Sequence, residues 1–437
     1  MPQSFNTKEY AVYLPAINSG YANFLTKIIP ADRSFPNGLD IKDFCVWNKK
    51  SKLFYHPFLL HSIGNFSALS TINNSVTQAG RNDFTFVGDS GGYQIGSGAL
   101  AGFKGLHKGM SAQDAMTVWA GAYDVKKWIV SWLDAYADYA MTLDMPLWAT
   151  DPKQGKDSPF NKCTVSELLA MTVDNLKFID LHGRKRTKWL NVVQGLDEQS
   201  TKDWWDGVKF FKCSGYALAG GAGAKGGLAQ VIRTTRMMHD EGHLRSGQDW
   251  LHALGVSTPV WAIMLTKIQN CLRKDNPNLT ISYDSSSPFQ TAGKFEQPNY
   301  TVPYTNKISS WNIKTAKSNT IQRFSFVGST DPFPYNSPLG QLMSLGHINV
   351  REELYSKKQF DTISNMLLTN HNIWVYLDAF ERANDETFKN KQMSNVPQRY
   401  IDAIAVIDDV FNSSNWHSIL VQNQALLNSV AASQYKT

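Results

Sequence analysis

Two aspartates, Asp89 and Asp284, stand in the same local setting although they lie far apart in the sequence. Each follows a run of β-branched and aromatic residues, 84–87 and 279–283, and each is followed by small residues that turn the chain. Carboxylates carried out of the interior on the carboxyl ends of buried strands can act as a nucleophile and as an acid or base. The pair therefore predicts an enzyme whose substrate lies between both side chains.

Polar or glycine residues also follow most of the other segments that we expect to form strands. β-prone runs predict strands over 84–87, 139–143, 190–193, 210–213, 251–256 and 279–283. The residues that follow or end these runs are Asp89, Asp144, Gln194, Gly220, Gly221, Gly255 and Asp284. In an open sheet only the strands near a switch point would carry such residues, whereas a closed barrel gathers all of its strand ends around one mouth.

Segments with helical periodicity separate these strands, and the clearest are 112–137, 164–181 and 230–240. Alternating strands and helices predict an α/β fold in which crossover helices join parallel strands. A doubly wound sheet and a closed barrel both satisfy this alternation. The marked strand ends favour the second, a (β/α)8 TIM-like barrel.

The 437 residues contain no internal repeat and no linker rich in proline, glycine or serine that would divide the chain. From about residue 325 the pattern becomes helical, most strongly over 366–384 and 396–412. We therefore expect the barrel over residues 1–324 and a C-terminal helical subdomain over residues 325–437.

The composition is that of a globular protein, with 42% hydrophobic and 18% charged residues. The net charge of +6 is compatible with a polyanionic partner and does not require one. The four cysteines are scattered without CxxC spacing, so we expect neither a disulfide framework nor a thiolate zinc site. Residues 1–4 do not resemble a secretory signal, and no apolar run approaches the ~18 residues that span a bilayer, so we expect a cytoplasmic protein.

The string Gly-Asp-Ser-Gly-Gly at 88–92 also occurs around the nucleophile of trypsin-like serine proteases. Those proteases are disulfide-rich, and their histidine precedes the serine at a long distance. Here no cysteine neighbours His56 or His61, and Tyr93 stands where proline is expected. We therefore exclude that class.

Seven motifs, in the same order, resemble those of the tRNA-guanine transglycosylase family. They are Asp-Ser-Gly-Gly-Tyr-Gln at 89–94, Thr-Leu-Asp at 142–144 with Ala-Thr at 149–150, Asn-Val-Val-Gln-Gly at 191–195, Gly-Tyr-Ala-Leu-Ala-Gly-Gly at 215–221, Leu-Gly-Val-Ser-Thr-Pro at 254–259, Tyr-Asp-Ser-Ser-Ser-Pro at 283–288 and Leu-Leu-Thr-Asn-His-Asn-Ile at 367–373. One such match is weak, but seven in order are a strong signal. The resemblance implies a (β/α)8 barrel and a base exchange in which a 7-deazaguanine replaces guanine on a ribosyl-enzyme intermediate.

The resemblance also implies roles for individual residues. Asp284 is the expected nucleophile at the C1′ carbon, as in a retaining glycosidase, and Asp89 the expected acid and base for the leaving and entering purine. Asp144 is expected to accept hydrogen bonds from the purine N1–H and 2-amino group, Gln194 and the amides after Ala219 to hold the 6-oxo group, and Tyr93 to stack on the ring. The full expected substrate-binding set is Ser90, Tyr93, Gln94, Asp144, Gln194, Ala219, Gly220, Gly221 and Leu254.

Each of these residues taken alone has an ordinary structural explanation. An aspartate after a strand is more often a helix cap or a turn residue, and a buried glutamine is more often a satisfied core amide. Only their joint occurrence on successive strand ends favours the functional interpretation.

The chain departs from the family pattern at the zinc site. The family holds zinc with three cysteines and a histidine, but here only His371 remains, and residues 323–329 contain no cysteine. A thiolate site cannot be built from the phenylalanines that stand there. We therefore expect no structural zinc, an apolar plug in its place, and no cofactor.

Two further departures concern the substrate. Pro288 is followed by Phe289 and Gln290, where the tRNA enzymes carry arginines that hold RNA, and Met145-Pro146 replaces Glu-Cys after the second carboxylate. These changes resemble the divergent, phage-encoded branch of the family that places 7-deazaguanines in DNA, which would act in the cytoplasm of the host cell.

We therefore expect a DNA-guanine transglycosylase whose partners are DNA and a free 7-deazaguanine base such as 7-cyano-7-deazaguanine. Phosphate contacts are expected from lysines on loops at the barrel mouth, Lys104, Lys108, Lys153 and Lys225. A tRNA-modifying enzyme, a nucleoside hydrolase and a non-catalytic barrel that binds nucleic acid remain alternatives, and the oligomeric state stays open.

Overall fold

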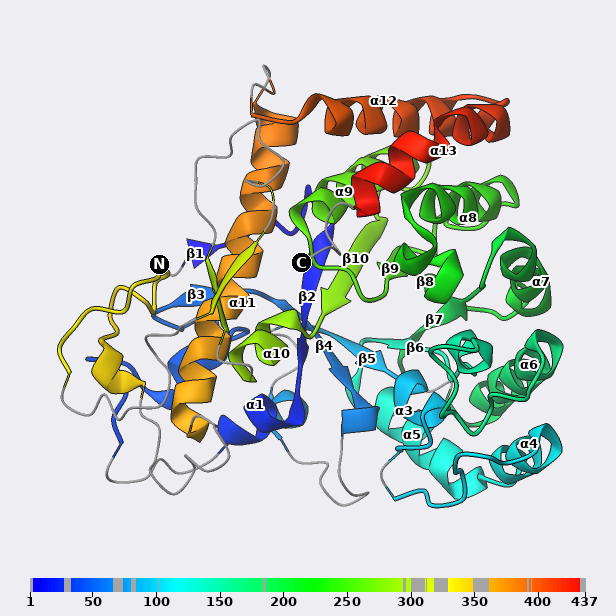
Figure 1. The fold of residues 1–437 in the computed structure, drawn as a ribbon, viewed down its shortest axis with the longest axis horizontal. Helices are drawn as coiled ribbons and strands as arrows, with labels where there is room; N and C mark the ends of the chain where they lie inside the picture. The colour runs from blue at the N-terminus through cyan, green and yellow to red at the C-terminus, as the bar shows by residue number, and fades with distance from the viewer. Residues whose placement is uncertain are drawn as a thin grey trace.

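In the computed structural model, eight parallel strands close into a barrel (Figure 1). The structure describes residues 3–26, 33–65, 74–79, 84–100, 102–183, 186–293, 296–299, 311, 313–317, 329–348, 361–390, 393 and 395–432. The barrel strands are β2 (Val12–Ile17), β4 (Phe58–Ser62), β5 (Thr85–Asp89), β6 (Tyr139–Met141), β7 (Lys188–Val193), β8 (Gly215–Leu218), β9 (Trp250–Ala253) and β10 (Thr280–Ser285). They follow one another around the barrel in chain order, and β10 closes it by pairing with both β9 and β2.

Helices cover the outside of the barrel, and side chains cap the first turns of several of them. The long ones are α5 (Tyr123–Tyr136), α6 (Val165–His182), α7 (Glu198–Val208), α8 (Leu228–Asp240), α9 (Pro259–Leu272) and α11 (Thr362–Asn384). Thr164 and Asp197 open α6 and α7 as capping boxes, and Thr258 caps α9 with proline in its first turn. The predicted (β/α)8 barrel with C-terminal helices is confirmed.

Several other elements are short. They are β1 (Gln3–Ser4), α1 (Ser19–Phe24), β3 (Phe54–Tyr55), α2 (Ser75–Gln78), α3 (Gly92–Gly96), α4 (Ala112–Ala120), α10 (Ser287–Gly293), β11 (Glu296–Asn299) and β12 (Lys314–Lys317). The helix expected over 112–137 is thus two helices, α4 and α5, because the chain leaves α4 at Gly121.

The strand expected over 210–213 is wrong. These residues form the turn after α7, where Phe210 is 86% exposed, and the strand is β8, which covers the first four residues of the motif at 215–221. The first residue of β8 is a glycine because the backbone of β9 lies very close. A Cβ at Gly215 would clash with the Trp250 carbonyl oxygen.

The barrel has two apolar layers, one inside and one between the strands and helices. The interior is filled by Val12, Leu14, Leu60, Val87, Met141, Leu190, Val192, Ala217 and Trp250. Because side chains alternate along a strand, residues two apart point the same way. Asp284 and Ser282 therefore share the inner face of β10, and His252 and Trp250 share the inner face of β9.

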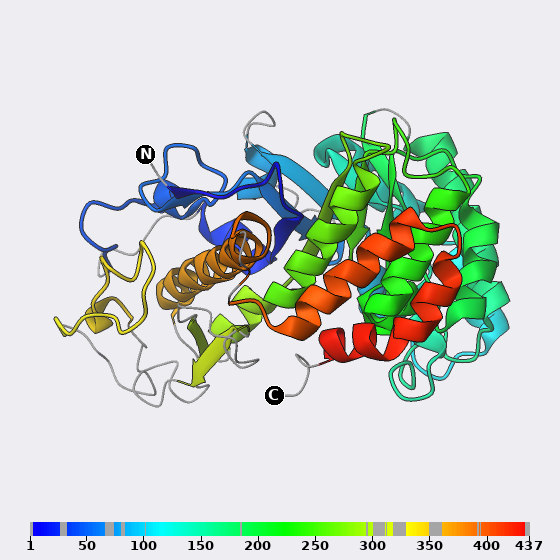
Figure 2. The same cartoon turned by 90° about the horizontal axis from the view of Figure 1, so that it is seen from above.

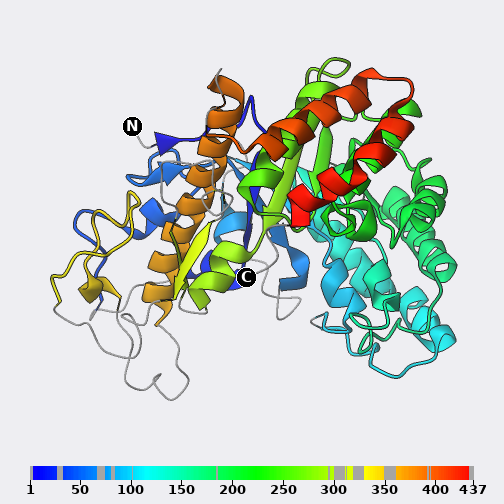
Figure 3. The same ribbon diagram turned by 45° about the horizontal axis from the view of Figure 1, so that its top comes forward.

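The C-terminal helices complete the outer layer. In Figure 1, α11 runs beside β2, and its Phe380 ring packs against Tyr13 and Tyr283 with centroids 4.9 and 5.5 Å apart. Figures 2 and 3 show α12 (Gln398–Asn412) and α13 (Trp416–Ala432) lying across α8 and α9. The predicted boundary at residue 324 falls outside the described residues and stays a prediction. Within the described ranges, no helix is both long and apolar enough to cross a bilayer.

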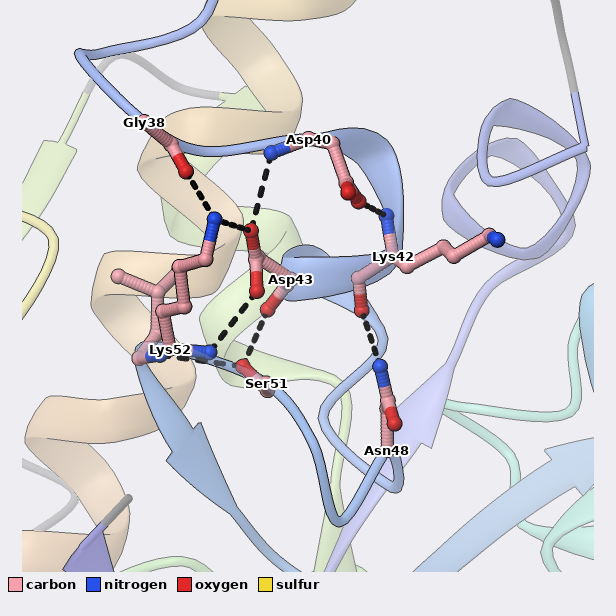
Figure 4. Close-up of polar contacts among 8 residues, drawn as sticks. Gly38, Asp40, Lys42, Asp43, Asn48, Ser51 and Lys52 are labelled. Atoms are coloured by element: carbon pink, nitrogen blue, oxygen red, sulfur yellow. Dashed lines mark hydrogen bonds and ion pairs between the residues drawn. The ribbon is translucent and has the colours of Figure 1, made fainter. Parts of the chain in front are cut away.

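A buried carboxylate, Asp43, organises the loop between α1 and β3 (Figure 4). Its two oxygens accept the backbone N–H groups of Asp40 at 2.9 Å and Lys52 at 2.8 Å, and its carbonyl oxygen accepts the Ser51 hydroxyl at 2.6 Å. The Lys52 ammonium, which donates to the Gly38 carbonyl, lies 3.8 Å from the carboxylate. These bonds give Asp43 a structural role, unlike the carboxylates described next.

Candidate active site

A cavity of about 800 Å³ lies at the carboxyl ends of the barrel strands. Every barrel strand contributes a lining residue at or near its end, among them Asn18, Ser62, Asp89, Asp144, Gln194, Ala219, Leu254 and Asp284. Cavities of this size hold small ligands, and in TIM barrels the catalytic residues lie on this face. Of the expected site residues, only Ser90 and Gly221 do not line the cavity.

Asp284 is held from one side. Its Oδ1 atom accepts the backbone N–H of Gly255 at 3.0 Å and lies 3.2 Å from Nε2 of His252. Among the residues that the structure describes, both hydrogen bonds go to Oδ1, so Oδ2 is the oxygen left to meet a substrate atom. Its side chain is 12% exposed, and it lies at the cavity surface.

Asp89 ends β5 on the same cavity. Its Oδ1 atom accepts the backbone N–H of Gly91 at 3.1 Å, and the hydroxyl of Ser62, its register partner on β4, hydrogen-bonds to the carboxylate. Burial raises the pKa of Asp89, and the charge of Asp284 raises it further, while both hydrogen bonds oppose the rise. A carboxyl group with a raised pKa can carry a proton closer to neutral pH, as a general acid must.

Asp144 follows β6 and is clamped by Gln194. The Gln194 amide donates to Oδ2 of Asp144 at 2.6 Å and to the Met145 carbonyl at 3.0 Å, and its oxygen accepts the Leu147 N–H at 2.9 Å. Burial, followed by the charge of Asp89, raises the pKa of Asp144 to about 7. Gln194 therefore orients Asp144, and its own polar atoms are already engaged with the protein.

The turn after Asp89 brings Tyr93 to the mouth, where it meets Trp148 from the segment after β6. Gly91 has a φ of 81°, which favours glycine, and it starts the short helix α3 that carries Tyr93. The Tyr93 ring is 69% exposed and stacks on Trp148 with centroids 5.3 Å apart and planes 28° apart. Both rings line the cavity, so they offer a flat apolar wall to a heterocycle.

The glycine loop after β8 takes a role different from the expected one at Gly221. The N–H of Gly221 donates to the Gly195 carbonyl at 2.5 Å, so this amide is engaged within the protein and does not face the cavity. Ala219 and Gly220 do line the cavity. Ser90 is also turned inward, where its hydroxyl donates to the Thr142 carbonyl at 3.1 Å. Ser90 and Gly221 therefore support the site without facing its space.

The four expected phosphate-binding lysines are exposed on loops that follow β5, β6 and β8. Lys108 pairs with Asp157, and Lys225 donates to the Gln154 side chain at 2.6 Å, which ties the β8 loop to the β6 loop. Lys104 lies on the loop after β5, and Lys153 lies on the loop after β6. All four thus belong to segments at the barrel mouth.

His371, the remaining member of the expected zinc set, is a buried residue of α11. Its Nδ1 atom lies 2.8 Å from the Ser337 hydroxyl, and its ring packs edge-on against Phe333. The predicted apolar plug at 323–328 lies outside the described residues. In the part of the chain that the structure describes, no cluster of three histidine, cysteine or acidic side chains is arranged to bind a metal.

The sequence does not predict several cavity residues, notably Ser62 and Trp148. It also does not predict His252, which lies behind Asp284. His252 stands inside an apolar strand two residues before Leu254, and the same alternation places Ser282 before Asp284. That alternation is a readable signal, because it puts polar side chains on the inner face of a barrel. Ser62 had no such signal, since β4 itself was not expected.

No protein-family model matches the chain, and a search of curated proteins gives no match. What the chain does is therefore inferred from its motifs and from the cavity.

Proposed function

We propose that this protein is a guanine transglycosylase that replaces guanine in DNA with a 7-deazaguanine through a covalent intermediate on Asp284. The observation that carries the proposal is the pair of carboxylates on one cavity at the barrel mouth, the partly buried Asp89 from β5 and the buried Asp284 from β10. Burial, and after it the charge of Asp284, raises the pKa of Asp89, which is consistent with a nucleophile and an acid acting on the same bond.

The exchange needs two displacements at the same carbon. In the first, Oδ2 of Asp284 bonds to C1′ as the bond from C1′ to guanine N9 breaks, and Asp89 gives its proton to the departing base. In the second, the nitrogen of the entering base bonds to C1′ and releases Asp284, while its proton returns to Asp89. The two hydrogen bonds at Oδ1 keep the carboxylate aligned in both steps.

We assign base recognition to residues that follow β5 and β6. The Asp144 carboxylate lines the cavity and can accept the N1–H and 2-amino hydrogens that guanine and 7-deazaguanines share, while the Gln194 amide donates to its Oδ2 atom. Tyr93, backed by Trp148, supplies the stacking surface.

The segment after the nucleophile supports DNA over tRNA. Phe289 belongs to the segment in which the tRNA enzymes carry arginines; it is 5% exposed, and its ring packs edge-on against Tyr21 at 5.7 Å between centroids. The Asn372 amide further anchors this turn through the Pro288 carbonyl at 2.9 Å. A packed phenylalanine cannot hold a phosphate as an arginine does. A duplex substrate would need its guanine extruded into the cavity.

A tRNA substrate is the second candidate, because the cavity residues expected for guanine recognition are the same in both enzymes. A non-catalytic binding barrel is disfavoured, since two buried carboxylates repel phosphate and cost burial energy without aiding binding. A nucleoside hydrolase would use the same two carboxylates but pass the intermediate to water. Product analysis separates all of these.

The test is incubation of the protein with labelled guanine or 7-cyano-7-deazaguanine and either DNA or tRNA. We expect label in DNA and a covalent protein–DNA adduct after denaturation, both absent in Asp284→Ala. Label in tRNA alone would favour the second candidate, and guanine release without incorporation would favour a hydrolase. An adduct that persists in Asp284→Ala would place the nucleophile elsewhere.

A further inference from the structure

Behind Asp284, a chain of polar side chains runs down into the barrel interior. His252 lies 3.2 Å from Oδ1 of Asp284 through Nε2, and its Nδ1 atom lies 2.8 Å from the Ser282 hydroxyl. The same hydroxyl accepts the Trp250 indole N–H at 2.7 Å. The three residues come from β9 and β10, whose register places Ser282 directly beside His252.

The end of this chain favours one direction for its hydrogen bonds. The indole nitrogen of Trp250 can only donate, so Ser282 accepts there and can donate its own hydrogen to Nδ1 of His252. The imidazole then carries its hydrogen on Nε2 and donates it to Asp284. The opposite tautomer would set a nitrogen lone pair against an ionised carboxylate, which is unfavourable in a dry interior.

Burying these polar side chains costs free energy, which indicates that they have a role. His252 and Ser282 are fully buried, and the interior around them is otherwise filled by apolar side chains. Apolar residues of similar volume would fill the same space without burying polar atoms.

We infer that His252 is a positioning residue for the nucleophile: with Ser282 and Trp250 fixing its tautomer, it donates an Nε2 hydrogen to Oδ1 of Asp284 and turns Oδ2 toward the sugar. This inference rests on the proposed function for the identity of the reaction. The hydrogen-bond arrangement itself belongs to the protein without substrate. Gly255 supplies the second donor to Oδ1, so the carboxylate is fixed by one backbone and one side-chain group.

The kinetic test compares His252→Leu, which removes the donor, with His252→Gln, whose amide N–H can reach a similar position. We expect His252→Leu to lower kcat for exchange by about tenfold to hundredfold, as for a lost hydrogen bond to a charged group, with the KM for the entering base changed by less than about twofold. His252→Gln should lose less than about fivefold, because the donor is retained.

A matched control is His56→Gln. His56 is also buried, and its Nε2 atom lies 2.8 Å from the Tyr13 carbonyl, but it does not line the cavity. Its replacement should leave kcat near that of the wild type, even if the protein is less stable. A His252→Leu enzyme with wild-type kcat would overturn the inference, and so would equal losses of kcat in His252→Leu and His56→Gln.

A spectroscopic test does not depend on activity. In 15N spectra of the wild-type protein, the imidazole signal that disappears in His252→Gln should show the hydrogen on Nε2, and Ser282→Ala should weaken that preference. A hydrogen on Nδ1 alone would overturn the inference even if exchange is observed. If the wild type shows no exchange while the hydrogen lies on Nε2, the proposed function fails and the arrangement around Asp284 stands.

Discussion

At the residue scale, the cavity holds three carboxylates in different environments. Asp284 accepts two hydrogen bonds at one oxygen, Asp89 accepts one from a backbone amide and one from Ser62, and Asp144 is clamped by Gln194. Burial raises the pKa of both Asp89 and Asp144. Acidic groups whose environments differ in this way can divide the roles of nucleophile, proton carrier and hydrogen-bond acceptor.

Replacing Asp89 with asparagine should remove the proton carrier while keeping the shape and the Gly91 contact. We expect exchange turnover to fall by about a hundredfold or more, the range for loss of an acid–base group, with little change in the binding of free guanine. Steady-state exchange and calorimetric binding measure the two effects separately. Unaltered turnover would remove Asp89 from proton transfer.

The pKa of Asp144, raised to about 7, predicts pH-dependent binding of the base. In the proposed binding mode the ionised carboxylate accepts the N1–H and 2-amino hydrogens, whereas the protonated form offers one hydrogen of its own and loses an acceptor. Affinity for guanine should therefore weaken as the pH falls below about 7, approaching tenfold per pH unit. Calorimetric titrations from about pH 5.5 to about pH 8.5 would show the trend around this pKa, and Asp144→Asn should flatten it.

At the element scale, much of the fold could be predicted from the sequence because most strands and helices have strong periodic patterns. The expected elements around 139–143, 190–193, 164–181 and 366–384 agree with β6, β7, α6 and α11. The errors have a local cause. Phe210 and Phe211 have high β propensity but lie just after the end of α7. The strand β8 starts with a glycine, and this glycine is needed only because β9 lies so close.

The candidate site could be predicted only at residues that belong to a local sequence motif. Asp89, Asp144, Gln194 and Asp284 belong to strand ends with recognisable motifs. The partners of Asp284 come from the inner faces of two strands, so their meeting depends on register, which the sequence of one strand alone does not state. Trp148 is likewise joined to Tyr93 only by the fold.

The loop around Asp43 allows a stability prediction with a built-in control. Asp43→Ala leaves two partly buried backbone N–H groups, those of Asp40 and Lys52, without their acceptor, which should cost about 2–4 kcal/mol. Asp40→Ala removes an exposed cap that accepts the Lys42 N–H at 2.7 Å, and should cost about 1 kcal/mol. Urea unfolding of both variants measures the difference, and equal losses would contradict the central role of Asp43.

At the scale of the whole molecule, the C-terminal helices pack against the outside of the barrel. Asp408 of α12 pairs with Lys267 of α9 at 2.8 Å, and Trp416 of α13 donates to Asp240 of α8 at 2.8 Å. Phe380 of α11 packs on strands from both ends of the barrel sequence. Closure between β10 and β2, and hence the position of Asp284, therefore depends on residues far along the chain.

The buried carboxylates also make the stability of the whole barrel depend on pH. Burial raises the pKa of Asp144 from 3.8 to about 7, so the folded state binds a proton that the unfolded state has released across this range. The free energy of unfolding that this group contributes is largest below about pH 4, declines as the pH rises, and is lost once the pH passes about 7. The carboxylate that we propose to recognise the base is thus held in place at the expense of stability.

Asp144→Asn should relieve this cost, because the asparagine oxygen can still accept the Gln194 amide without carrying a charge. At about pH 8 we expect the free energy of unfolding to exceed that of the wild type by about 2–4 kcal/mol, and at about pH 4 the two should agree within about 1 kcal/mol. Urea titrations at both pH values provide the comparison. At each pH the variant is compared with the wild type, so the contributions of all other titrating groups cancel. A variant whose stability relative to the wild type is the same at both pH values would show that the cavity solvates the ionised carboxylate well. The same variant should bind guanine poorly, so a gain in stability together with a loss of binding would tie the cost of the buried charge to recognition of the base.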